Sequence, residues 1–482
     1  MKSASALPVR SKWAVLTAVM LGSIMGPIDG SIVNTVLPAI SDYFAIDMAL
    51  VQWVPTIYLL AISALILLYG RLGDMIGYKR VFLTGLASFV LTSILCGVSQ
   101  NIWMLITFRA FQGVAAAMTM SVSFAIVTSS FPPSERGKAM GIYAIAIAAG
   151  LALGPTLGGV ITEYLNWRYI FFINIPIGIS ALILGSRVIP RGERDPEQTL
   201  DWQGALTALV FLGSLTMYAN RGEDWGWLSG TCIVLLCITL ISGIVFFSIE
   251  RSSKQPMLNL SLFKNRTFSF ANMSALFNFI ALYTMIFITP FFLKAVLGYS
   301  ILKLGIVMVA SPAAILIVAP FSGSLSDRIG SRPLTVTGML VSALGLYLLS
   351  TLDQSSGVFD VVWRLIIMGV GMGVFQSPNN SAVMGSVPPW RLGISSGVLA
   401  AMRNVGMVLG LAVAGAVLYH IAPVAAEKPP EMFSPAEVDQ FLNGLQWTYV
   451  TGAGLALVSA LASFIAGNVK RKDVAGAKAP PS

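Results

Sequence analysis

The sequence is poor in the residue types on which most metal and catalytic sites depend. Its 482 residues include only three cysteines and one histidine, and charged residues make up 11% of the chain. Cys96, Cys232 and Cys237 lie in apolar stretches, without the spacing of a metal site or of a disulfide framework. We therefore expect the cysteines to fill the core and the protein to hold no metal.

Motifs of ATP-driven and catalytic proteins are missing as well. No glycine-rich phosphate loop that ends in Gly-Lys-Ser/Thr occurs, which argues against an ATP-driven pump. Neither a soluble domain nor a nucleophile constellation can be recognised. We predict that the chain is not an enzyme, uses no cofactor, and draws the energy for any transport from a gradient.

Apolar residues dominate what is present. Hydrophobic residues account for 56% of the chain, whereas an ordinary soluble domain is about 25% charged. Stretches of about 20 apolar residues predict membrane-spanning helices rather than the strands of a barrel. We place fourteen spans, near residues 13–37, 51–70, 81–100, 102–128, 138–162, 169–187, 203–220, 229–249, 268–293, 302–322, 334–351, 360–384, 393–421 and 446–467. The fold class is thus an all-α membrane protein.

The distribution of basic residues predicts the orientation of these spans. With both termini in the cytoplasm, most of the 30 Lys and Arg residues fall in cytoplasmic segments, as the positive-inside rule requires. The net charge of +9 then reflects orientation and attraction to anionic lipid, so nucleic-acid binding need not be invoked. We expect a multi-pass protein of the cell (inner or plasma) membrane.

Two segments of the chain repeat at a long period. GRLGDMIG at residues 70–77 returns as GSLSDRIG at 323–330, and FPPSERG at 131–137 returns as VPPWRLG at 387–393. Two six-span halves explain both repeats, and the spans near 203–220 and 229–249 have no counterpart. We predict a six-plus-two-plus-six arrangement: residues 1–200, an insert at 201–266, a second half at 267–470 and a cytoplasmic tail at 471–482. A substrate site near the midplane between the halves follows from this design.

Asp29 lies well inside the first span, where an ionised side chain costs roughly 2.5–3.5 kcal/mol. Such a residue is a functional candidate by default, although it could serve only to hold a basic residue on a neighbouring helix. Arg109 is buried about seven residues inside the fourth span, and Asp29 is one possible partner for it. We predict that Asp29 carries the proton and that Arg109 is part of the coupling site.

Several motifs together resemble the fourteen-span drug/proton antiporters of the major facilitator superfamily. The resemblance covers nearly the whole chain. It rests on the loop at 70–80, on RAFQG at 109–113, on GLALGPTLGG at 150–159, on IDGSIVNTVLP at 28–38 and on the stretch from Asn166 to Pro176. Met75 and Tyr78 stand where basic residues are common in the loop signature. The resemblance implies a major facilitator fold and proton-coupled multidrug efflux, with antibiotic resistance as its consequence.

Two groups of residues are expected to govern conformational change. Glycines at 150–159 clear one helix face and Pro155 kinks the span, which predicts a hinge, although static packing would use the same residues. Asp74 can accept hydrogen bonds from Arg136 or from a helix N-terminus in the other half and so latch one state, with Asp327 as its weaker counterpart. A solvated turn is the alternative. The predicted latch comprises Gly70, Arg71, Asp74, Gly77, Lys79, Arg136, Asp327 and Arg328, and the hinge comprises Gly150, Gly154, Pro155, Gly158 and Gly159.

Polar residues deep in the spans form the predicted substrate cavity. Arg403 is the only deep charge of the second half and could meet substrate, or could instead only tie helices together. The full set comprises Asn34, Gln112, Arg403, Asn404, Gln376, Asn379 and Asn380. Because the second half offers a deep cation and no deep carboxylate, we expect lipophilic neutral, monocationic or anionic substrates to be preferred over dications.

We predict a proton-coupled secondary efflux transporter whose partners are a lipophilic small molecule, protons and the lipid bilayer. A proton-coupled or facilitative importer of a small metabolite or lipid fits the same fold, because fold does not set direction. A non-transporting membrane receptor or scaffold is an alternative of a different functional class, and such a protein would not need Asp29. The sequence identifies neither the substrate nor an accessory efflux protein.

Overall fold

The computed structural model describes residues 9–46, 48–191, 201–227, 229–253, 256, 258, 260–299, 301–423 and 434–468. Within these ranges the chain forms helices joined by turns, and no strand occurs. Helices satisfy their own backbone hydrogen bonds, which a lipid environment requires. The all-α expectation is confirmed, whereas the predicted tail at 471–482 lies outside the described residues.

The helices fall into three consecutive sets along the chain. The first set comprises α1 (Val9–Phe44), α2 (Met48–Val51), α3 (Trp53–Ile76), α4 (Tyr78–Gly97), α5 (Ile102–Ser130), α6 (Arg136–Tyr164), α7 (Tyr169–Phe172) and α8 (Asn174–Val188). The second comprises α9 (Trp202–Trp225), α10 (Gly230–Ser252) and the short 3₁₀ helix η1 (Leu260–Lys264). The third comprises α11 (Arg266–Phe291), η2 (Phe292–Val296), α12 (Ile301–Met308), α13 (Ala310–Ile329), α14 (Ser331–Leu349), α15 (Val358–Gly385), η3 (Pro389–Arg391), α16 (Leu392–Ile421) and α18 (Pro435–Ala466).

Twelve stretches of the described chain are long and apolar enough to cross a membrane. The helices α6 and α9 are not among these twelve, although they contain 29 and 24 residues. The structure therefore establishes a polytopic helical protein, and the count of fourteen spans stays a prediction.

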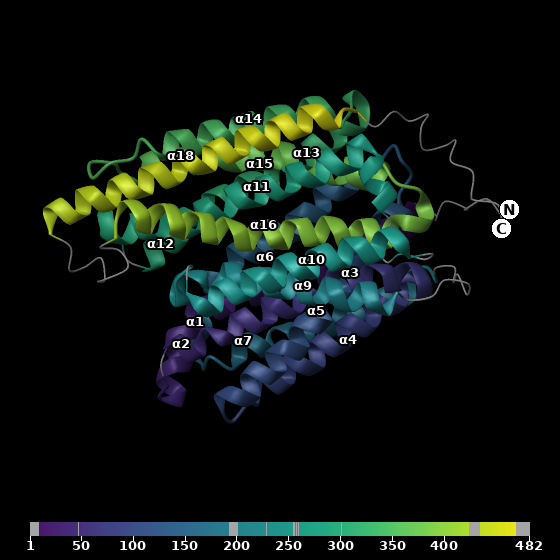
Figure 1. Ribbon diagram of the computed structural model, residues 1–482, viewed down its shortest axis with the longest axis horizontal. Coiled ribbons are helices and arrows are strands. Elements are labelled where there is room, and N and C mark those ends of the chain that lie inside the picture. Colours follow the sequence, from purple (N-terminus) through teal and green to yellow (C-terminus); the bar gives the residue numbers. More distant parts are fainter. Residues whose placement is uncertain are drawn as a thin grey trace.

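Helices of the first and third sets pack into two groups that lie one above the other in Figure 1. In the first group α1 packs along α6 and α8, and α5 packs between α3 and α4. In the second group α11 packs along α16 and α18, and α15 packs between α13 and α14. The helix α9 contacts α10, α3 and α16, so the middle set touches both groups.

The two groups meet at two close backbone crossings. A Cβ atom added to Gly70 of α3 would lie 2.9 Å from the carbonyl oxygen of Gly393 in α16. On the second crossing, a Cβ atom on Gly137 of α6 would overlap the carbonyl oxygen of Gly323 in α13. Glycine is needed at these positions because any side chain would push the helices apart.

One carboxylate reaches across each crossing. Asp74, near the end of α3, accepts hydrogen bonds from the backbone N–H groups of Gly393 (2.7 Å) and Ile394 (2.8 Å), at the start of α16. Asp327, near the end of α13, accepts from the N–H groups of Gly137 (3.0 Å) and Lys138 (3.1 Å), at the start of α6. Each carboxylate thus caps a helix N-terminus of the other group, where the helix dipole favours negative charge.

Of the two partners considered for Asp74, the structure shows the helix N-terminus and not Arg136. The Nε atom of Arg136 donates to the carbonyl oxygens of Thr128 (3.2 Å) and Phe131 (3.4 Å) within its own group. The symmetry of the two caps follows the sequence repeat, because both the carboxylate and the helix start recur in it.

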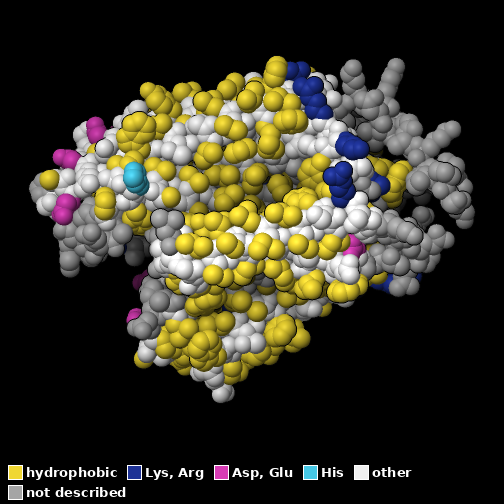
Figure 2. Space-filling model, viewed as in Figure 1, with side chains coloured by type: hydrophobic (Ala, Val, Ile, Leu, Met, Phe, Trp, Pro, Cys, Tyr) yellow, Lys and Arg dark blue, Asp and Glu magenta, His cyan; other side chains and the backbone are white. Residues whose placement is uncertain are grey.

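Charged side chains separate toward the two ends of the molecule. On the face drawn in Figure 2, Lys and Arg gather toward the right-hand end, most of the visible Asp and Glu lie toward the left, and hydrophobic side chains cover the middle. This apolar belt between two polar ends is the surface expected of a protein embedded in a bilayer.

Our first prediction is that Asp74→Asn combined with Asp327→Asn loosens the end of the molecule at which the helices cross. Removing both charges weakens four charge-assisted hydrogen bonds between the two groups of helices. The fraction of molecules in which the groups are separated at this end should therefore rise roughly 5–150-fold. Spin labels at exposed Arg80 and Trp390 would report the change as a longer distance component, in a protein whose exposed Cys237 is replaced by serine.

Asp353→Asn is the matched control for this measurement. Asp353 is an exposed carboxylate whose pKa is held below its ordinary value by hydrogen bonds from Ser355 and Ser356, so its replacement also removes a charge. All of these bonds lie within one loop. An unchanged distance distribution in the double variant would show that the two caps do not hold the groups together.

Candidate functional site

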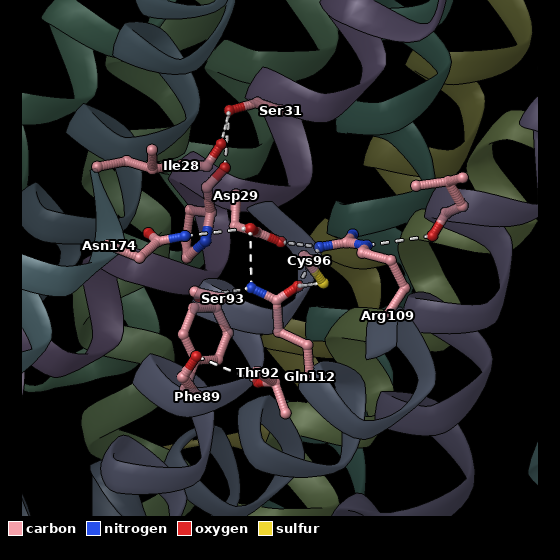
Figure 3. Close-up of polar contacts among 12 residues, drawn as sticks. Ile28, Asp29, Ser31, Phe89, Thr92, Ser93, Cys96, Arg109, Gln112 and Asn174 are labelled. Atoms are coloured by element: carbon pink, nitrogen blue, oxygen red, sulfur yellow. Dashed lines mark hydrogen bonds and ion pairs between the residues drawn. The ribbon is translucent and has the colours of Figure 1, made fainter. Parts of the chain in front are cut away.

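Asp29 lies at the centre of a fully buried polar cluster in the first group of helices (Figure 3). Its side chain projects from α1 toward α5 on one side and α8 on the other. Its neighbours Ile28, Ile32 and Val33 are buried apolar residues, which withhold water from the carboxylate. A charge in such surroundings must find its partners on other helices.

Three side chains donate to this carboxylate. Arg109 of α5 donates from Nη1 to Oδ2 and forms a salt bridge in which both side chains are fully buried. The Oδ1 atom accepts from Gln112 Nε2 at 3.1 Å and from Asn174 Nδ2 at 3.2 Å. The partnership that the sequence left as one possibility for Arg109 is the one that the structure contains.

Arg109 is fixed by more than the salt bridge. Its Nε atom donates to the carbonyl oxygen of Val54 at 3.2 Å, and its guanidinium lies 4.1 Å from the ring centroid of Tyr58. Both residues belong to α3, so Arg109 links α5 to α3 as well as to α1. The Nη2 atom of Arg109 is buried and has no hydrogen-bond partner among the described residues.

Gln112 belongs to this cluster and lies one helical turn from Arg109. Its Nε2 atom also donates to Ser93 Oγ at 2.9 Å, while Oε1 accepts from Arg109 Nη1 at 2.7 Å and from the Cys96 thiol at 3.6 Å. All of its hydrogen-bonding capacity is thereby used. Sequence analysis placed Gln112 in the substrate cavity, but its contacts place it in the Asp29 cluster.

Asn174 donates to Asp29 directly and is not among the site residues predicted from the sequence. It entered only as part of a motif that resembles a family signature. Asn174 begins α8, directly after the break that separates α8 from α7, and is fully buried. The signal that could have found it is an amide deep in an otherwise apolar span, which is expected to face a partner and not lipid.

The cluster holds Asp29 as a paired carboxylate. One of its three donors is the cation Arg109, and the other two are the neutral amides of Gln112 and Asn174. Three polar atoms of the same cluster have no hydrogen-bond partner among the described residues: Arg109 Nη2, Asn174 Oδ1 and the Tyr58 hydroxyl. These atoms give the cluster a second set of possible hydrogen bonds.

Two of the predicted hinge glycines, Gly150 and Gly154, lie directly against the helix that carries Asp29. A Cβ atom on Gly150 would lie 2.9 Å from Pro27 Cβ, and one on Gly154 would overlap Ser31 Oγ. Ser31 itself donates to the carbonyl oxygens of Pro27 (2.7 Å) and Gly150 (3.3 Å). The pair Gly150 and Gly154 therefore sets the closest approach of α6 to α1.

The remaining hinge residues differ from this pair. Gly158 is buried, whereas Gly159 is exposed and a Cβ atom there would meet nothing within 4 Å. The helix α6 continues through Pro155, whose side chain lies outside the described part. The four glycines thus do not all serve one contact face.

Arg403 forms a second buried cationic site, between the two groups of helices. It belongs to α16, is 8% exposed, and its guanidinium lies 5.4 Å from the ring centroid of Phe124 in α5 and 4.8 Å from that of Phe279 in α11. In the described chain no carboxylate lies within ion-pair distance of Arg403. Aromatic faces offset only part of the cost of burying a cation, so an anionic or electron-rich partner would be favoured here.

The other predicted cavity residues are not joined to Arg403 by any hydrogen bond in the described chain. Gln376, Asn379 and Asn380 are buried in α15, and Asn404 is buried in α16 beside Arg403. The Nδ2 atoms of Asn379 and Asn404 have no partner among the described residues. Asn34 is exposed and takes no part in the Asp29 cluster.

The other predicted latch residues do not bridge the two groups through their side chains. Lys79 Nζ donates to the carbonyl oxygen of Ser186 at 2.6 Å, within the first group. Arg71 Nε is buried without a partner in the described chain, and Arg328 is exposed. Gly77 adopts φ +96° between α3 and α4, which explains a glycine there.

Comparisons with known proteins agree with this architecture. The model of the Major Facilitator Superfamily matches residues 19–411, with a second match to residues 268–481. The riboflavin transporter RibZ of Clostridioides difficile is 34% identical over 410 residues, which are 84% of this chain and 88% of RibZ. The multidrug resistance protein Stp of Mycobacterium tuberculosis is also 34% identical, over 85% of this chain and 76% of its own length.

Solved structures show the same fold at lower identity. The human organic anion transporter MFSD10 superposes with a TM-score of 0.66 at 17% identity, over 95% of this chain and 100% of the other. At this identity the likeness concerns the fold alone.

Our second prediction concerns the stability of the Asp29 cluster. Arg109→Gln leaves a buried carboxylate without its cation, which should lower the free energy of unfolding by about 3–5 kcal/mol. Asp29→Asn combined with Arg109→Gln removes both charges, so the double variant should be more stable than Arg109→Gln alone. Unfolding of the purified protein in detergent, followed as a double-mutant cycle, measures the coupling. If the double variant were as unstable as the sum of the two single variants, Asp29 and Arg109 would be energetically independent.

Proposed function

The chain belongs to the major facilitator superfamily, and from this premise we propose that it is a proton-coupled antiporter that exports lipophilic small molecules. The observation that carries the proposal is the fully buried Asp29–Arg109 pair, together with the unpartnered polar atoms beside it. A transporter that exchanges a proton for substrate needs an ionisable group deep in the membrane whose partner can be replaced. Asp29 is the carboxylate of the described chain that meets this need.

Coupling requires that proton and substrate favour opposite conformations of the two groups of helices. We infer that protonation of Asp29 releases Arg109, and that this change reaches α6 because Gly150 and Gly154 pack directly on α1. Since α6 begins at the cap formed by Asp327, a movement of α1 against α6 would bear on that latch. A change at Asp29 would thus be transmitted to the crossing at Asp327 through the contact between α1 and α6.

We also propose the topology. Two six-span halves flank a two-span insert, with both termini in the cytoplasm and with α6 and α9 counted as spans. The domain limits are those given from sequence, at residues 200, 266 and 470. The support is the sequence repeat, the matching carboxylate caps and the Lys and Arg at one end of the molecule. In this orientation the two caps close the cytoplasmic end, so the structure corresponds to a state closed to the cytoplasm.

Arg403 guides the proposal for substrate charge. It is a buried cation among aromatic rings, and no carboxylate of the described chain pairs with it. We propose that neutral, monocationic or anionic lipophilic compounds are preferred over dications, because a second positive charge would find no counter-charge near Arg403. The resemblance to Stp, whose name indicates multidrug resistance, is consistent with such a range.

A second candidate function is uptake of a small metabolite. RibZ, at 34% identity over most of both chains, is named as a riboflavin transporter, and a proton-coupled importer would use the same fold. Import and export predict opposite directions of substrate movement relative to the proton flow, so one assay separates them. A receptor or scaffold predicts no flux at all.

Our third prediction is that Asp29→Asn abolishes proton-driven accumulation. In proteoliposomes with an imposed pH gradient, the wild-type protein should move substrate uphill against the proton flow, whereas Asp29→Asn should retain only downhill exchange, at least tenfold below the driven rate. Asp353→Asn, which removes an exposed loop carboxylate, should behave as wild type. Full proton exchange by Asp29→Asn would overturn the role of Asp29, and movement of substrate with the protons would favour the importer.

A panel of riboflavin and of matched neutral, monovalent and divalent aromatic compounds completes this assay. Robust export of a rigid dication, with weak handling of its monovalent analogue, would contradict the proposed charge preference. If riboflavin were the one compound transported, the proposed multidrug export would have to be replaced by transport of riboflavin.

Our fourth prediction concerns the α1–α6 contact. Gly154→Leu would place a side chain against Ser31, so it should slow transport at least tenfold while substrate binding is kept within a few-fold. Gly159→Leu is the matched control, because its side chain would enter open space on the same helix. Binding lost as severely as transport in Gly154→Leu would mean that Gly154 shapes the binding site and not the movement.

A further inference from the structure

The helices α9 and α10 carry a groove on the outer face of the protein. The groove has a volume of about 590 Å³ and is lined by Phe211 of α9, Leu260 of η1 and a continuous stripe of α10 that runs from Thr239 to Arg251. Figure 1 places α9 and α10 in front of the two groups, and hydrophobic side chains cover this face in Figure 2. The groove is thus separate from the buried Asp29 cluster.

The walls of the groove are suited to a hydrocarbon chain. Leu240 and Ile244 are 58% and 68% exposed, and the ring centroids of Phe211 and Phe247, which also line the groove, lie 6.3 Å apart. Gly243 lies between them, and a Cβ atom there would approach the Phe211 ring to 3.1 Å. Because Gly243 has no side chain, the Phe211 ring can lie close against the backbone of α10 and form a wall of the groove.

The length of the groove corresponds to one leaflet of a bilayer. From Leu240 to Arg251 the helix rises about 16 Å at roughly 1.5 Å per residue, close to half of the roughly 30 Å hydrocarbon thickness. The helix α10 is also the most apolar and the least buried of the twelve span candidates, so its outer face meets lipid. A groove of this length would hold one acyl chain and place the lipid headgroup at Arg251.

Arg251 supplies the charge for that headgroup. It is exposed in the last turn of α10 and forms no ion pair within the described ranges. The carboxylate of its neighbour Glu250 is turned inward and accepts from the backbone N–H of Leu258 at 2.8 Å. The guanidinium at the mouth of the groove is therefore not neutralised by the adjacent acid, and a phosphate is the anion that Arg binds well in a forked geometry.

We propose that this groove binds one anionic phospholipid, with an acyl chain between α9 and α10 and its phosphate on Arg251. The proposal goes beyond transport and does not depend on the direction or coupling of transport. Because α9 also packs on α3 and α16, a bound lipid would stabilise the middle helices against both groups. The groove would then be a site of lipid dependence and not of substrate passage.

Native mass spectrometry of the full chain, titrated with dioleoyl-phosphatidylglycerol or dioleoyl-phosphatidylcholine, tests the proposal. We expect one tightly retained phosphatidylglycerol per chain, held about fivefold more tightly than phosphatidylcholine. Arg251→Gln should remove the preference between the two lipids. Gly243→Leu should reduce retention of both lipids, because its side chain would displace the Phe211 ring that lines the groove. Glycerol phosphate, which carries the headgroup phosphate without acyl chains, should not compete.

Two variants serve as matched controls. Arg187→Gln removes an exposed arginine from the last turn of α8, and Gly230→Leu adds a side chain in open space at the other end of α10. Both should bind lipid as wild type does. Unchanged lipid binding in Arg251→Gln and Gly243→Leu would overturn the proposal. So would a wild-type dimer that Gly243→Leu dissociates, since a second copy would then occupy the groove.

Discussion

The salt bridge between Asp29 and Arg109 is the interaction on which the first group of helices depends. Two opposite charges buried in an apolar bundle are tolerable only when each is held by several hydrogen bonds. The donors and acceptors come from different helices: α1 gives the carboxylate, α5 the guanidinium, α3 a carbonyl oxygen and α8 an amide. Satisfying one buried charge therefore fixes the relative positions of four helices.

The contacts that join the two groups are of another kind. At each crossing a glycine lets two backbones touch, and one carboxylate caps a helix of the opposite group. Apolar packing accompanies these polar contacts, because one buried hydrophobic cluster contains Ile66 of α3, Val383 of α15 and Val398 of α16. A buried charge cluster within one group and small polar caps between the groups are a combination suited to movement of rigid groups against each other.

The middle helices give the molecule a further boundary with lipid. The inner side of α9 touches both groups, while α10 is turned outward and carries the groove that ends at Arg251. Because α9 contacts α3 and α16, a lipid bound in the groove would lie next to a helix that touches both groups.

Much of the fold was predictable from the sequence, because hydrophobic runs of membrane length leave a helix as the only local solution. A carboxylate in such a run, as at Asp29, must be functional or paired for the same reason, and the repeat of residues 70–77 at 323–330 predicted that Asp74 and Asp327 have equivalent places. The side-chain partners could not be predicted in this way. That Gln112 belongs to the Asp29 cluster, that Asn174 completes it, and that Asp74 caps α16 instead of meeting Arg136 depend on which helices lie side by side. The sequence by itself determined the helices and the positions of their buried charges, since these follow from local hydrophobicity. Only the tertiary structure decided which charges and amides meet, because those distances are set by the packing of helices far apart in the chain.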